Sequence, residues 1–118
     1  MNTEIPLYKQ IATQLENSIL AGTFLPGYRI PSVRELAAQY QVNPNTAQRA
    51  VWELKQEGLL ISSRSKGTLV TDDVELICRF RQKRCKELTH FFLQRMKMLG
   101  YSHEQIQAMS LQLICDEG

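Results

Sequence analysis

Residues 32–58, with the sequence SVRELAAQYQVNPNTAQRAVWELKQEG, decide the fold of this chain. They contain two helix starts. Ser32 can cap a first helix, and Glu35, three residues later, can complete a capping box. Asn43 can cap a second helix, with Pro44 at its first position, where the missing N–H of proline leaves no donor unpaired. Two short helices joined by a tight turn form a helix-turn-helix, and we predict that motif here.

Apolar residues at helical spacing predict the buried faces of both helices. Val42, in the short connection, is expected to be buried between them. Gly58 is suited to ending the second helix, because glycine readily adopts the left-handed conformation found at helix C-termini. The residues expected to face inward are Leu36, Ala37, Tyr40, Ala47, Ala50, Val51 and Leu54.

The flanking segments complete a small domain. A helix is expected from Pro6 to Gly22, and residues 28–30 can form a short extended piece. Two β-prone runs, 59–61 and 68–70, flank the polar loop SSRSKG and predict a hairpin with a basic tip. Three helices followed by such a hairpin wing are a winged helix-turn-helix, and we expect this mainly α fold over residues 1–71. The apolar residues of the first helix follow one helix face: Leu7, Ile11, Leu15, Ile19 and Leu20.

Residues 72–118 differ from the first part, because turn-forming residues become rare. A long helical pattern runs from the acidic pair Asp72 and Asp73 to Gly100, and Ser102 with Gln105 offers a second capping box. We therefore predict a two-helix hairpin. It is too small to bury much apolar surface by itself, so we expect it to be a dimerisation region. The residues expected at the dimer interface are Ile77, Phe80, Leu88, Phe91, Phe92, Met96, Leu99, Ile106, Met109 and Leu113.

The composition is that of a globular protein without a membrane span. The 118 residues are 43% hydrophobic and 22% charged, and no apolar run approaches the ~18 residues that suggest a transmembrane helix. The N-terminal sequence lacks the pattern of a secretory signal. Three unclustered cysteines indicate reduced thiols, so a cytoplasmic location is expected.

No residue pattern points to catalysis, a metal or a bound cofactor. There is no Ser/His/Asp, Cys/His, P-loop or paired-carboxylate arrangement, so an enzyme is not expected. The two histidines, His90 and His103, are poorly spaced with the cysteines for a metal site. Cys78 and Cys85 lie about 10 Å apart along one helix, so a redox switch would need disulfides between chains. The sequence identifies no small-molecule effector.

Six segments in a fixed order carry a family resemblance. They are IPLYKQI (5–11), Gly22 with Leu25 and Gly27, IPSVRELA (30–37), VNPNT (42–46), Leu54 with Glu57 and Gly58, and KGTLV (66–70). Together they resemble the GntR family of bacterial transcription regulators. The short helical tail resembles the YtrA subfamily, in which a short dimerisation region replaces a large effector domain. Two positions depart from the family pattern: Val51 stands where an aromatic residue is common, and Ser65 where an extra glycine is common.

The helix that begins after Asn43 is expected to enter the major groove of DNA, which admits a helix and displays a distinct pattern for each base pair. The resemblance implies that Arg34 contacts DNA beside this helix. A flexible hairpin loop with cations suits the minor groove, where the potential is most negative. The residues expected to bind DNA are Arg34, Asn43, Asn45, Thr46, Gln48, Arg49, Arg64, Lys66 and Gly67.

Several of these residues also have a purely structural interpretation. Capping alone can explain Asn43, Arg49 can lie on a solvated flank, and Arg34 can pair with a neighbouring glutamate. The basic loop can be an ordinary solvated turn. A second basic run, at residues 79–86, is either a second nucleic-acid-binding patch or a helix face in water. We favour the helix face in water, because the cations point around the whole helix.

These features and the resemblance predict a homodimer that binds a palindromic operator in double-stranded DNA. The resemblance implies a transcription regulator, and we expect a repressor. The resemblance also implies that its own operon and an adjacent ABC transporter are among the regulated genes. The alternative is a winged-helix module that contacts proteins without binding DNA. Arg34, Arg64 and Lys66 have no evident use in that alternative. No cofactor and no membrane partner are expected.

Overall fold

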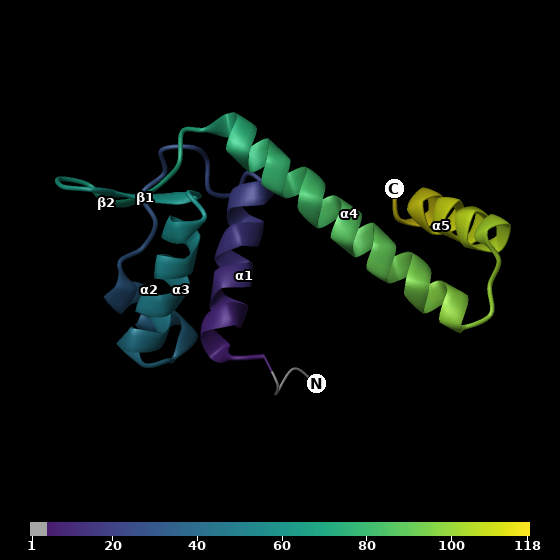
Figure 1. Cartoon of the computed structure of the whole chain (residues 1–118), viewed down its shortest axis with the longest axis horizontal. Coiled ribbons are helices and arrows are strands. Elements are labelled where there is room, and N and C mark those ends of the chain that lie inside the picture. Colours follow the sequence, from purple (N-terminus) through teal and green to yellow (C-terminus); the bar gives the residue numbers. More distant parts are fainter. Residues whose placement is uncertain (1–4) are drawn as a thin grey trace. The chain divides into compact units, whose positions relative to one another are not determined.

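The computed structural model describes residues 5–118, which form five helices and one two-stranded sheet. By its packing, the chain divides into an N-terminal unit that ends at Arg81 and a C-terminal unit, Gln82–Gly118. The elements are α1 Leu7–Leu20, α2 Val33–Tyr40, α3 Pro44–Gln56, β1 Leu60–Ser63, β2 Gly67–Val70, α4 Val74–Met98 and α5 His103–Glu117 (Figure 1). The fourth helix, α4, therefore contributes to both units.

The helix starts of the N-terminal unit follow from local chemistry. The Ser32 hydroxyl accepts from the Glu35 backbone N–H at 3.1 Å, and the Ser32 backbone N–H donates to the Glu35 carboxylate at 2.9 Å. Asn43 caps α3 through its side-chain oxygen, which accepts from the Asn45 N–H at 2.8 Å. Between the helices, Gln41 adopts a left-handed conformation (φ 56°) that ends α2 and turns the chain. The capping box and the helix-turn-helix are confirmed.

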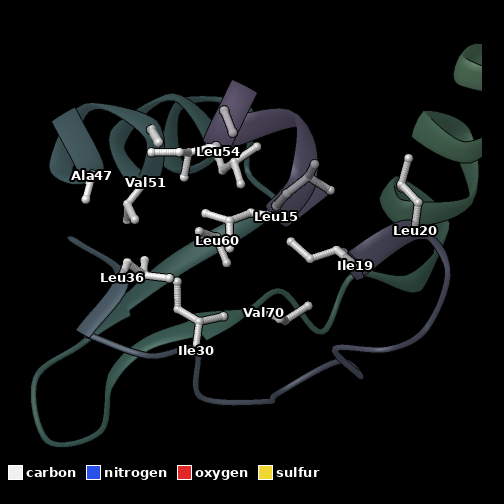
Figure 2. Packing of buried hydrophobic residues seen from close by; sticks show 14 of the residues in the cluster. Leu15, Ile19, Leu20, Ile30, Leu36, Ala47, Val51, Leu54, Leu60 and Val70 are labelled. Atoms are coloured by element: carbon white, nitrogen blue, oxygen red, sulfur yellow. The ribbon is translucent and has the colours of Figure 1, made fainter. Parts of the chain in front are cut away.

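One cluster of buried apolar side chains holds the N-terminal unit together (Figure 2). Residues from α1, α2, α3 and both strands meet in it, and Figure 2 shows Leu15, Leu36, Leu54 and Leu60 converging from these elements. Of the residues expected to face inward, six are at most 5% exposed: Leu36, Ala37, Ala47, Ala50, Val51 and Leu54. Val51, which stands where an aromatic residue is common in the family pattern, thus fills its core position with a smaller side chain.

Three apolar residues are less buried than expected. Tyr40 and Val42 are half-buried and pack against the edge of the cluster. Leu7 is 57% exposed, because it is the first residue of α1 and the helix enters the core one turn later, at Ile11. The predicted spacing of α1 therefore holds from its second turn onward.

The hairpin is anchored by a third, short extended segment. β1 and β2 pair antiparallel, with Leu60 opposite Val70. The expected piece at 28–30 lies along β2: Arg29 bridges Leu69, and the Ile30 N–H donates to the Thr68 carbonyl at 3.0 Å. β1 begins one residue later than predicted, because the Leu59 N–H donates to the Leu54 carbonyl and closes the end of α3.

The first two turns of α4 belong to the N-terminal unit. Ile77 is 5% exposed within the core cluster, and Phe80 packs against the same cluster. The Arg81 guanidinium donates to the Leu20 carbonyl at the end of α1, at 2.8 Å. Ile77 and Phe80 were expected at the dimer interface, but their own chain covers Ile77 fully and Phe80 in part. Helical periodicity places these two apolar residues on one face of the helix. It does not show which surface covers that face.

The C-terminal unit contains the rest of α4, a turn and α5. Gly100 adopts φ 93° after α4, and the predicted capping box at Ser102 is present, with the Ser102 hydroxyl accepting from the Gln105 N–H at 3.2 Å. Ile106 is 3% exposed, so this residue too is covered by its own chain rather than free for a partner. Within residues 5–118, no helix is long and apolar enough to cross a membrane.

Candidate DNA-binding interface

The outward face of α3 consists of the residues that do not pack into the core. Ala47, Ala50 and Leu54 are at most 1% exposed and fix the rotation of the helix. Asn45, Gln48 and Arg49 then point to solvent, and Thr46 is half-buried at the margin. Residues three and four apart share a helix face, so Asn45, Gln48 and Arg49 form one continuous polar surface at the N-terminal half of α3.

Trp52 extends this surface and was not predicted. It is 56% exposed and follows Gln48 by four residues and Arg49 by three. An aromatic residue next to the buried Val51 suggests core, yet the helical spacing from Gln48 would have placed it outward. Its indole has one N–H donor and a broad apolar ring, which suit contact with a phosphate and a sugar.

Asn43 uses only part of its side chain to cap α3. Its side-chain oxygen accepts from the Asn45 N–H, as the structural interpretation expected. The side chain is exposed, and its amide N–H groups are donors that this cap does not use. The capping interpretation is therefore confirmed for the oxygen, and a DNA contact of the amide group stays a prediction.

Arg34 is exposed on α2, next to Glu35, whose carboxylate already accepts a hydrogen bond from the Ser32 backbone N–H. The Ser32 backbone N–H, and after it the Ser32 side chain, lower the pKa of the Glu35 carboxyl from its ordinary value. That carboxylate stays charged and bound to the start of its own helix. Within residues 5–118, Arg34 forms no ion pair, so the expected alternative of a glutamate partner is not realised there.

The wing presents its cations on a turn with constrained backbone. Arg64 and Lys66 are exposed, and the Lys66 N–H donates to the Ser63 hydroxyl at 3.2 Å. Gly67 has φ 81°, a conformation that residues with a Cβ rarely adopt. A Cβ at this position would lie 3.5 Å from the Arg29 Nε atom, an ordinary contact, so the backbone conformation and not a lack of space favours glycine here. Gly67 therefore shapes the wing.

Arg29 is a second residue that sequence reasoning missed. It is exposed and lies beside the wing, because its segment pairs with β2 at Leu69. Nothing local marks Arg29 as part of the wing, since the pairing partner lies forty residues away in the sequence. The extended piece predicted at residues 28–30 was the sequence signal that could have pointed to this pairing.

Other candidate sites are weaker. Within residues 5–118, no group of three or more histidine, cysteine or acidic residues is placed to hold a metal. The three cysteines are free and exposed. An open hollow of about 440 Å³ lies between the end of α1 and the start of α4 and is lined mainly by apolar residues. Cys78 and Arg81 are among its lining residues.

An exposed recognition helix, a cationic wing and an arginine on the preceding helix together define a winged-helix DNA-binding domain. The family model described as bacterial regulatory proteins of the gntR family matches residues 7–70. The chain belongs to this GntR family, whose members are transcription regulators and not enzymes.

Two curated relatives extend the comparison. The uncharacterised HTH-type transcriptional regulator YhcF of Bacillus subtilis is 37% identical over 101 residues, which cover 86% of this chain and 84% of YhcF. The HTH-type transcriptional repressor YtrA of the same organism is 40% identical over 70 residues, which cover 59% of this chain and 54% of YtrA. The expected likeness to YtrA-type regulators is thereby confirmed.

Two solved structures resemble this fold. A GntR family transcriptional regulator from Listeria monocytogenes superposes with a TM-score of 0.86 at 35% identity, covering 95% of this chain and 98% of the other. The structure of AraR(DBD) in complex with operator ORX1 has a TM-score of 0.54 at 34% identity, covering 57% of this chain and 81% of the other. The first likeness includes the helical tail, and the second is limited to about half of this chain.

Proposed function

We propose that this protein is a homodimeric, sequence-specific DNA-binding repressor that acts in the cytoplasm. The observation that carries the proposal is the outward surface of α3, where Gln48, Arg49 and Trp52 are exposed opposite a fully buried face. The similarity to an operator-bound domain supports DNA as the partner of this surface. It also favours DNA binding over the alternative of a module that contacts only proteins.

The proposed roles follow from the chemistry of each part. The N-terminal half of α3 enters the major groove, where amide and hydroxyl groups can read base edges. Arg34 binds a phosphate beside this helix, and the wing cations enter the minor groove. The proposed DNA-binding domain is residues 1–71, and the first turns of α4 pack on it. The proposed DNA contacts are Arg34, Asn43, Asn45, Thr46, Gln48, Arg49, Trp52, Arg64, Lys66 and Gly67.

The exposed apolar surface of the C-terminal unit supports dimerisation. Leu88 is 61% exposed, Phe91 56% and Leu99 72%, and Met109 and Leu113 on α5 are also exposed. Large apolar side chains exposed in this number on one small unit are typical of a protein interface, and a second copy of the chain offers the same side chains. The proposed interface therefore consists of Leu88, Phe91, Phe92, Met96, Leu99, Met109 and Leu113. It leaves out Ile77 and Ile106, which are buried, and the half-buried Phe80, which packs against the core of the N-terminal unit.

A two-fold dimer presents two identical recognition helices, which suits an operator of inverted half-sites. The repressor role is supported by the similarity to YtrA of Bacillus subtilis, which is a transcriptional repressor. We propose the regulator's own operon, and an adjacent ABC transporter, as its targets on the strength of the family resemblance.

Selection of duplexes from random DNA by the full chain, followed by binding titrations, tests the proposal. We expect enrichment of an inverted repeat, and at least tenfold weaker binding by Arg34→Ala and Lys66→Ala. Lys97→Ala, which removes an exposed cation of the C-terminal unit, is the matched control and should bind as the unaltered chain does. Selection that enriches no sequence, or variants that all bind alike, would contradict the proposed function.

A further inference from the structure

The first turn of α1 contacts the recognition helix through two pairs of side chains. The Arg49 guanidinium lies over the Tyr8 ring, with its Cζ atom 4.1 Å from the ring centroid. The Lys9 ammonium lies 3.3 Å from a Glu53 carboxylate oxygen. Consecutive residues of α1 therefore hold residues that are one turn apart on α3.

The ion pair between Lys9 and Glu53 changes what Arg49 can do. An arginine and a glutamate four residues apart on a helix can form an ion pair with each other. Here Lys9 engages Glu53, and within residues 5–118 Arg49 forms no ion pair. The recognition helix thus keeps an arginine whose charge is not neutralised by its own acidic neighbour.

The ring contact orients Arg49 without consuming its hydrogen-bond donors. A guanidinium over an aromatic face is held by the ring quadrupole, while its N–H donors at the edge stay available for a planar or tetrahedral anion. Tyr8 is half-buried and packs against the core, so the ring is itself fixed in place.

Space for an anion lies next to this pair. An open hollow of about 280 Å³ is lined by Leu7, Tyr8, Asn45, Thr46 and Arg49. Three of these side chains bring N–H or O–H donors from α3, and Tyr8 contributes the ring that lies under Arg49. The hollow opens on the same surface of α3 that we propose to face DNA.

We propose that Tyr8 is a positioning residue, which holds the Arg49 guanidinium so that it binds a DNA backbone phosphate at this hollow. Lys9 supports the arrangement by keeping Glu53 away from Arg49. The inference rests on the proposed DNA-binding function and adds α1 to it. Of the two interpretations of Arg49, it favours the DNA contact over the solvated flank.

A double-mutant cycle tests the inference with the full chain and a labelled duplex obtained by the selection above. Arg49→Ala should weaken binding and lower the salt dependence by about one phosphate contact. Tyr8→Leu should weaken binding about two- to fivefold, the range expected of an exposed cation–π contact, and should have no further effect in the Arg49→Ala background. Tyr8→Phe keeps the ring and should bind as the unaltered chain does.

Three results would overturn the inference: equal weakening by Tyr8→Leu in both backgrounds, no effect of Arg49→Ala, or loss of binding by Tyr8→Phe. If Tyr8→Leu fails to fold, the ring-current shift of the Arg49 side-chain resonances in the unaltered chain tests the contact directly. Its absence would also count against the proposal. Arg34→Ala and Lys66→Ala do not involve Tyr8, so their binding separates failure of this inference from failure of the proposed function.

Discussion

Truncating Phe91 should weaken the dimer. The Phe91 side chain is 56% exposed in the single chain, and its guanidinium neighbour Arg95 covers part of the ring at 4.8 Å. Full burial of such a side chain contributes about 2.5 kcal/mol, so burying the exposed part contributes roughly 1.4 kcal/mol for each copy. A two-fold interface contains Phe91 twice, which gives about 3 kcal/mol and a dissociation constant raised about 100-fold by Phe91→Ala.

Sedimentation velocity over a dilution series measures this change directly. Leu111→Ala is the matched control, because Leu111 lies in the same unit, is 57% exposed and is outside the proposed interface. We expect the control to dimerise as the unaltered chain does. An unchanged dissociation constant for Phe91→Ala would refute the interface assignment. Equal weakening by both variants would show that the apolar surface is used differently from the arrangement proposed here.

Three further predictions concern the N-terminal unit. Trp52 is the sole tryptophan of the chain, so its emission should shift to shorter wavelength when a saturating selected duplex binds, and an unchanged spectrum would remove Trp52 from the DNA surface. Because contact with Ser32 lowers the pKa of Glu35 below 4.5, its charge stabilises the fold above that pH and the stabilisation is lost as pH falls through the lowered pKa. Glu35→Gln should therefore show a weaker loss of stability in acid by urea unfolding, and an identical acid dependence would contradict this. Gly67→Ala should cost about 1 kcal/mol or more of stability, since alanine is strained at φ 81°; a thermal melting curve equal to that of the unaltered chain would show that the wing adjusts freely.

The helix starts could be predicted because capping is local chemistry. Ser32 with Glu35, and Ser102 with Gln105, each form the expected reciprocal hydrogen bonds over three residues of sequence. Asn43 caps α3 as its residue type predicts. No distant residue is needed for these bonds, so the sequence alone is enough to locate them.

Contacts between distant segments could not be predicted in the same way. Periodicity identifies Ile77 as apolar, yet only the packed structure shows that it belongs to the core of the N-terminal unit. Arg29 lies beside the wing because it pairs with Leu69 of β2, and Tyr8 of α1 contacts Arg49 of α3. Trp52 could have been placed from spacing, but aromatic residues are so often buried that residue type was the stronger and misleading signal.

The cap of α3 limits what Asn43 can recognise. An asparagine that pairs with adenine through two bonds must accept from the exocyclic amine while it donates to the ring nitrogen. The Asn43 oxygen already accepts from the Asn45 N–H, so this two-bond reading of adenine must use the second lone pair of that oxygen, in an orientation that keeps the cap intact. The two amide hydrogens take no part in the cap and can donate to purine N7, guanine O6, thymine O4 or phosphate oxygens.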